Sequence, residues 1–156
     1  MEDDQLKKIL ASVKTIAMVG VSSVNQQEKK SQIKRRPSII VMKYLQEFGY
    51  KVIPVNPNSK GKQLHGETVF ANLKDIAIPI DLVNVFRPSI ETPTIAKQSV
   101  AMGAKVIWLQ YGIHSEEAKA ITNAASITYV ANKCIKQEYQ RLFLKMNPVF
   151  PLLRNS

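Results

Sequence analysis

The sequence has little cysteine, few acidic residues and no long apolar run. Cys134 is the one cysteine, so the chain forms no internal disulfide and no zinc cluster of several cysteines. No apolar run approaches the length of a membrane span. The start, MEDDQLKKIL, lacks the basic and apolar regions of a secretory signal. We therefore expect a cytoplasmic protein that does not engage a membrane.

Acidic residues are scarce beside basic ones. The 12 acids against 22 lysines and arginines give a net charge of +10, which favours a polyanionic partner. That partner is either a nucleic acid or a phosphorylated small molecule, and a basic surface also serves plain solubility. Helix-turn-helix and aromatic–basic motifs are not recognisable, so nucleic-acid binding through the basic surface is the less favoured alternative.

The pattern of apolar residues indicates the fold. The 156 residues are 45% hydrophobic, which suits one globular domain. Apolar strands alternate with amphipathic helices, as in a parallel sheet covered on both faces. We predict an α/β fold: doubly wound and Rossmann-like, with a mainly parallel five-stranded sheet and helices on both faces. The domain is expected over 1–145, followed by a C-terminal tail, 146–156. The expected strands are 15–20, 51–57, 81–86, 105–110 and 127–130, and the expected helices are 5–12, 37–48, 92–103, 115–126 and 135–144.

Helix-end signals support these boundaries. Thr92 and Ser115 are candidate N-caps, and Gly49 stands where a helix would end. The region 58–80 breaks the alternation of strands and helices, and we predict only a short helical turn near 72–76.

The first strand-to-helix connection points to phosphate. In such folds ligands bind outside the carboxyl ends of the strands. Gly20 permits a tight turn and a close approach to the backbone, and the helix beginning at Pro37 offers free N–H groups. A basic loop, 23–35, lies between them. We interpret it as phosphate-binding, with one phosphate at the backbone and Ser22 and others near Ser38; an ordinary solvated loop is the alternative.

The second connection argues against NAD. A dinucleotide site has G-x-G-x-x-G and a later acid, whereas this chain keeps only Gly20 and places Asn56 after the second strand, followed by Lys60 and Lys62. A neutral amide beside lysines suits a nucleotide with extra phosphates better than a carboxylate does. The P-loop pattern is also absent, so hydrolysis of ATP is not expected.

Five motifs carry a resemblance to a known family: VGVSS, RPSIIVMKYLQEFGYKVIPVNP, DLVNVFRPS, AKVIWLQYGI and NKCIKQEYQRL. The sequence resembles the CoA-binding domain proteins, small stand-alone Rossmann-like proteins similar to the CoA-binding domain of the succinyl-CoA synthetase α subunit. The resemblance covers roughly residues 14–143. It implies that coenzyme A, or an acyl-CoA, lies across the carboxyl ends of the strands. The residues that it implicates are Gly20, Val21, Ser22, Arg36, Pro37, Ser38, Asn56, Pro57, Phe86, Arg87, Gln110 and Gly112.

The chain departs from the family pattern at one place. Several residues are added around QQEKKSQI, between the glycine turn and the R-P-S motif, and they are interpreted as a basic lid suited to the 3′-phosphate of CoA. Cys134 and Lys136 belong to the last motif without a defined role.

Two functions follow from the resemblance. We favour a CoA-binding module that is non-catalytic or regulatory, because no catalytic residue stands out: His65 and His114 are expected at the surface, and Trp108 in the core. An accessory subunit or small enzyme of acyl-CoA metabolism is the alternative. A protein partner or a homo-oligomer stays open, and no metal site is expected.

Overall fold

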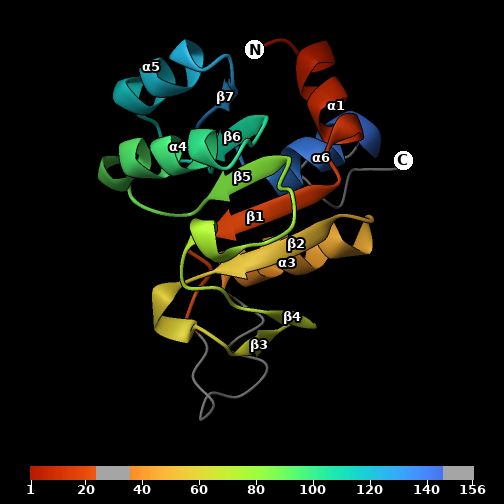
Figure 1. The fold of residues 1–156 in the computed structure, drawn as a ribbon. Helices are drawn as coiled ribbons and strands as arrows, with labels where there is room; N and C mark the ends of the chain where they lie inside the picture. Colours follow the sequence, from red (N-terminus) through yellow and green to blue (C-terminus); the bar gives the residue numbers. More distant parts are fainter. Residues whose placement is uncertain (24–35, 146–156) are drawn as a thin grey trace.

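The computed structural model describes residues 1–23 and 36–145. Its centre is a sheet of five parallel strands in the order β2-β1-β5-β6-β7 (Figure 1). The α/β doubly wound fold predicted from the sequence is confirmed. The strands are β1 (Thr15–Val19), β2 (Lys51–Val55), β5 (Leu82–Val85), β6 (Val106–Leu109) and β7 (Thr128–Val130).

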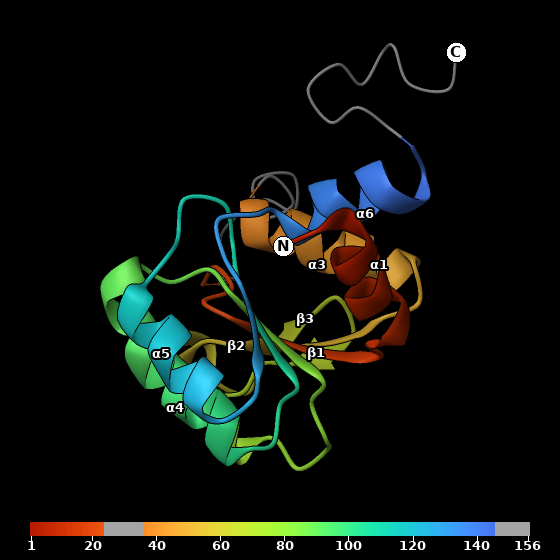
Figure 2. The same ribbon diagram turned by 90° about the horizontal axis from the view of Figure 1, so that it is seen from above.

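Helices cover both faces of this sheet. Figure 2 shows α1, α3 and α6 on one side and α4 with α5 on the other. Every expected strand and helix is present, and each observed end lies within two residues of the expected one. The helices are α1 (Asp3–Ser12), α3 (Pro37–Glu47), α4 (Thr92–Ala101), α5 (Glu116–Ala124) and α6 (Ile135–Phe143).

The strands alternate between two hydrophobic cores. In β1, Ile16 and Met18 pack with α1, α3 and α6, whereas Ala17 belongs to the core beneath α4 and α5. All residues of β5 and β6 are buried. Burial on both faces explains why these strands read as continuous apolar runs in the sequence.

Two helix-end predictions hold and one is wrong. The Ser115 hydroxyl accepts the Ala118 N–H at 3.1 Å and caps α5. Gly49 ends α3 with a positive φ of 95°. Thr92 is not a cap: it is the first helical residue of α4 after Glu91, and its hydroxyl donates to the Ser89 carbonyl at 2.6 Å. A preceding 3₁₀ turn, η3 (Ser89–Glu91), already directs the chain into the helix.

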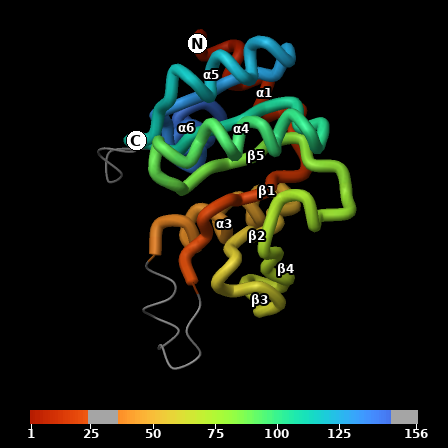
Figure 3. The backbone as a smooth tube through the Cα atoms, turned by 60° about the vertical axis from the view of Figure 1, so that its left-hand side comes forward, coloured from red at the N-terminus to blue at the C-terminus, as the bar shows by residue number. Residues whose placement is uncertain are grey.

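The region 58–80 contains the predicted helical turn, observed as η2 (Leu73–Asp75), and a hairpin that was not predicted. The hairpin pairs β3 (Gln63–Leu64) with β4 (Glu67–Thr68) and lies beyond β2 (Figure 3). His65 and Gly66 form its turn with φ values of 48° and 83°. A two-residue turn with both φ positive is favoured in hairpins, but it is usually signalled by Asn or Gly at the first position. Because His65 occupies this first position, the sequence gives no sign of the turn.

Asp81 joins the amino ends of β1 and β5, at the opposite end of the sheet from the carboxyl ends where ligands are expected. Its carboxylate accepts the Lys14 N–H at 2.9 Å and the Thr15 N–H at 3.2 Å. Burial raises the pKa of Asp81, but these two hydrogen bonds, a third from the Thr15 hydroxyl and the charge of Lys105 together lower it by more, so the net pKa is below the ordinary value.

Two expected segments lie outside the described residues: the basic loop, apart from Ser23, and the tail 146–156. Within residues 1–23 and 36–145, no helix is long and apolar enough to cross a membrane.

Candidate functional site

The sheet has one point where the strand order reverses. From β1 the chain passes to β2 on one side, then returns to β5 on the other side of β1. The connections that leave β1 and β5 therefore pass to opposite faces of the sheet, towards α3 and α4, and the crevice between them is where open α/β sheets bind ligands. The Phe86 N–H donates to the Val19 carbonyl at 2.8 Å and ties the two ends together.

Gly20 and Arg87 meet at this point. Gly20 has a φ of 90°, and its N–H donates to the Val55 carbonyl at 3.0 Å. A Cβ atom on Gly20 would lie 2.6 Å from Arg87 Cδ and 3.0 Å from the Phe86 carbonyl carbon. The missing side chain therefore leaves the space through which Arg87 crosses the end of β1.

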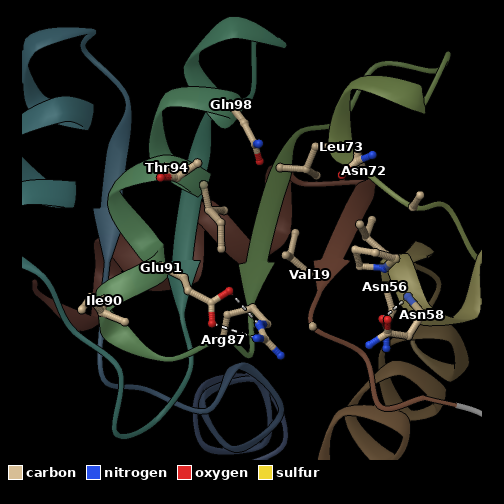
Figure 4. A pocket seen from close by; sticks show the side chains of 15 residues that line it. Val19, Asn56, Asn58, Asn72, Leu73, Arg87, Ile90, Glu91, Thr94 and Gln98 are labelled. Carbon is tan, nitrogen blue, oxygen red and sulfur yellow. Dashed lines mark hydrogen bonds and ion pairs between the residues drawn. The ribbon is translucent and has the colours of Figure 1, made fainter.

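Glu91 holds the guanidinium of Arg87 in place. Arg87 Nη2 lies 2.8 Å from Glu91 Oε2, and Nε lies 3.2 Å from Oε1 (Figure 4). Both side chains are more than 40% exposed. The pair is thus open to solvent, where an ion pair contributes little to stability and a competing anion reaches the guanidinium.

A cavity of about 570 Å³ opens beside this pair, between the carboxyl ends of the strands and α4. Figure 4 shows neutral amides and a hydroxyl around it, with aliphatic side chains between them. Such a lining hydrogen-bonds the polar edge of a ligand and covers its apolar faces. The lining residues are Val19, Gly20, Val55, Asn56, Pro57, Asn58, Ala71, Asn72, Leu73, Arg87, Ile90, Glu91, Thr94, Ile95 and Gln98.

The loop after β1 is fastened to the start of α3. The Ser22 N–H donates to the Ser38 hydroxyl at 2.9 Å, and the two hydroxyls lie 3.2 Å apart. Arg36 Nη1 donates to the Ser23 carbonyl. Ser38 is buried, so its hydroxyl shapes this turn.

Asn56 fastens the same loop from the other side. Its Nδ2 donates to the Val21 carbonyl at 2.8 Å and to the Ser23 hydroxyl at 3.1 Å, while its Oδ1 accepts the Asn58 N–H at 2.8 Å. The Val21 side chain is buried, so only its backbone faces this network. Asn56 stands where an NAD-binding protein would have an acid that binds the ribose. Its side chain is instead hydrogen-bonded to other residues of this protein.

The loops after β6 and β7 form a second group at the same edge of the sheet. The Gly112 N–H donates to Asn132 Oδ1 at 2.7 Å, and the Asn132 N–H donates to the Ile113 carbonyl at 3.0 Å. Trp108 is fully buried, as expected, and its indole N–H donates to the Lys133 carbonyl at 2.8 Å. These bonds hold the two loops together.

The predicted site residues therefore divide into three sets. Four line the cavity: Gly20, Asn56, Pro57 and Arg87. The loop and helix start beside it hold Val21, Ser22, Arg36 and Ser38, with Pro37 as the first residue of α3. Gln110 and Gly112 belong to the second group, at the loops after β6 and β7. Phe86 stands apart from these sets and packs against the core on the α3 side.

Sequence reasoning missed most of the cavity wall. Asn72 lies within the irregular region 58–80, and Thr94 and Gln98 lie on α4, so no local pattern marked them. Glu91 was detectable, since it stands four residues after Arg87 with the opposite charge. Within residues 1–23 and 36–145, no group of three or more His, Cys, Asp or Glu side chains is arranged to hold a metal ion.

Known proteins resemble this chain over most of its length. YneT of Bacillus subtilis (strain 168), described as an uncharacterized protein, is 36% identical over 132 residues, which cover 85% of this chain and 90% of that protein. The solved structure of cell-free ID.343 from Thermus thermophilus is 36% identical with a TM-score of 0.80, covering 92% of this chain and all of that one. A hypothetical protein from Pyrococcus horikoshii OT3 is 34% identical with a TM-score of 0.77, over 91% and 92% of the two chains.

A family match agrees with the architecture of the site. Residues 14–140 match the sequence description of a family defined as a CoA binding domain. The matched range starts just before β1, runs into α6 and includes every residue of the cavity. This chain belongs to the CoA binding domain family.

Proposed function

We propose that the protein binds coenzyme A, free or as an acyl-CoA, across the carboxyl ends of the strands, as a non-catalytic or regulatory module. The observation that supports this most is the approach of Arg87 over Gly20 at the point where the strand order reverses. It sets a cation beside an open backbone turn, next to a cavity, in a chain of the CoA binding domain family.

The phosphates of CoA are assigned to the neighbourhood of Gly20. Arg87 then exchanges the Glu91 carboxylate for a phosphate, which is a favourable charge-assisted partner. Arg36 stands at the other side of the same loop, at the N-terminal end of α3, where phosphate is also favoured. The two arginines thus flank one anion site.

The cavity is assigned to the adenosine end of the ligand. Its volume of about 570 Å³ lies within the range of small-molecule sites. Asn58, Asn72 and Gln98 supply neutral donors and acceptors for a heterocycle and a sugar, and Leu73 and Ile95 supply apolar walls. The rest of the ligand then runs towards Gln110.

Two measurements test the proposal. Mass spectrometry of small molecules released from the denatured protein should find CoA or an acyl-CoA. Titration calorimetry should find CoA bound more tightly than dephospho-CoA, and NAD bound poorly. Tight binding of NAD with none of CoA would overturn the assignment.

The variant Arg87→Met should weaken CoA roughly 10- to 100-fold, because one charge-assisted hydrogen bond contributes about 1.5–3 kcal/mol. Arg141→Met is the matched control: Arg141 pairs with Asp3 and Glu138, outside the candidate site. Equal affinities of both variants for CoA would remove Arg87 from the phosphate site.

A further inference from the structure

Asn84 is a polar residue in an otherwise apolar, fully buried strand. It lies in the middle of β5, its exposed fraction is 0%, and its register partners are Met18 and Trp108. Buried amides are normally satisfied by hydrogen bonds. Asn84 Oδ1, however, has no hydrogen-bond partner among the described residues. This side chain is therefore unfavourable for stability and needs another explanation.

The other half of the Asn84 amide points at Gln110. The Ile135 N–H lies 3.4 Å from Gln110 Oε1, and since a backbone N–H only donates, the atom facing it is the oxygen. Asn84 Nδ2 lies 3.4 Å from the same oxygen and 3.3 Å from the Trp108 carbonyl oxygen. Both neighbours only accept, so the Asn84 amide has one satisfactory orientation.

This chain of bonds fixes the orientation of Gln110 as well. Its Oε1 is turned inward to two donors, and no described residue accepts from its Nε2. Gln110 keeps 8% exposure at the carboxyl end of β6. Its outer face is therefore an N–H donor, whereas an unrestrained glutamine offers either a donor or an acceptor.

We propose that Gln110 Nε2 donates to a carbonyl oxygen on the thiol-bearing arm of the ligand, and that Asn84 is the positioning residue that keeps this donor outward. The inference rests on the proposed binding of CoA. An uncharged N–H group is a suitable donor for a neutral carbonyl oxygen. The phosphates of the ligand are assigned to the charged side chains of Arg87 and Arg36 at the neighbouring loops. The arm of CoA offers amide carbonyls, and an acyl-CoA adds the thioester carbonyl.

Calorimetry with CoA and acetyl-CoA on the full chain tests the proposal. Gln110→Met removes the donor without adding charge, and we expect about a tenfold loss of affinity for acetyl-CoA, the value of one hydrogen bond of ordinary strength. Gln110→Glu should lose at least as much. Gln5→Glu is the control for the added charge, because its Oε1 only accepts the Glu2 N–H in the capping box of α1, and a carboxylate does the same.

Asn84→Leu tests the positioning role. Leucine has the same side-chain branching and no polar atom, so the melting temperature should stay level or rise while acetyl-CoA affinity falls about three- to tenfold. The double variant Asn84→Leu/Gln110→Met should bind no more weakly than Gln110→Met alone, since Asn84 acts through Gln110. If Asn84 were purely structural, Asn84→Leu would lower the melting temperature, and its loss of acetyl-CoA affinity would add to that of Gln110→Met in the double variant.

The outcomes distinguish a failure of CoA binding from a failure of the role of Gln110. A parent protein that binds neither ligand overturns the proposed function. A parent that binds them, with Gln110→Met unchanged, overturns only the donor role of Gln110. Losses for CoA and acetyl-CoA alike assign the bond to an amide carbonyl of the arm, and a loss for acetyl-CoA alone assigns it to the thioester carbonyl.

Discussion

Replacing Gly20 by alanine tests how tightly Arg87 packs against the turn after β1, through the loss of folding stability that the added methyl group causes. A left-handed φ costs an alanine about 1–2 kcal/mol. The added methyl group would meet Arg87 Cδ at 2.6 Å and the Phe86 carbonyl carbon at 3.0 Å. Overpacking of this kind costs about 1–3 kcal/mol. The free energy of unfolding should therefore fall by about 2–5 kcal/mol, which is roughly 5–20 °C in melting temperature for a domain of this size.

Gly49→Ala is the matched control for the backbone term. Gly49 has nearly the same φ, 95°, but no atom within 4 Å of the added methyl group. The free energy of unfolding of Gly49→Ala should therefore fall only by the cost of backbone strain, about 1–2 kcal/mol. Thermal denaturation by circular dichroism compares the two variants.

A second substitution relieves part of the expected clash. Adding Arg87→Ala to Gly20→Ala removes the two nearest atoms and should restore part of the lost stability, while the contact with the Phe86 backbone stays. Equal losses for Gly20→Ala and Gly49→Ala would refute the reasoning, because Arg87 would then move aside at no cost.

Two further predictions concern stability. The pKa of Asp81 is lowered from 3.8, so the stability that its ionised form contributes is present above that value and is lost as the pH falls through the lower folded pKa. At about pH 6, Asp81→Asn should therefore unfold at a lower urea concentration than the parent, and this difference in midpoint should shrink below about pH 3. A difference that stays constant with pH would contradict this. Ser115→Ala should destabilise the protein by about 1 kcal/mol, because the α5 cap is lost. Ser115→Asp should keep most of the parent's stability, because aspartate also caps a helix, and thermal denaturation compares the two variants.

The sequence predicts the fold because its local signals agree with one another. Strands buried on both faces read as apolar runs, and Ser115 and Gly49 mark helix ends where the structure has them. Thr92 shows the limit of such signals, because the 3₁₀ turn before it already bonds to its hydroxyl. A residue of capping type caps a helix only where its own backbone is not helical, and Thr92 already has helical dihedral angles whereas Ser115 is extended.

The candidate site is less predictable for a physical reason. Gly20 and Arg87 are visible in the sequence, but their contact depends on the pairing of β1 with β5. Asn72 and Gln98 reach the cavity from separate elements, and Asn84 reads as one polar residue in a strand. Their roles arise from tertiary neighbours that no local pattern encodes.

The bond between Trp108 and Lys133 makes the protein its own optical reporter. Trp108 is the one tryptophan of the chain, so its fluorescence is free of overlapping emitters of the same kind. The buried indole donates to the carbonyl of Lys133, just before α6, and the Trp108 carbonyl accepts from Asn84. A fully buried indole emits at short wavelength, and a red shift reports the entry of water around it. A change in the packing of the segment before α6 against Trp108 is therefore readable without any attached dye.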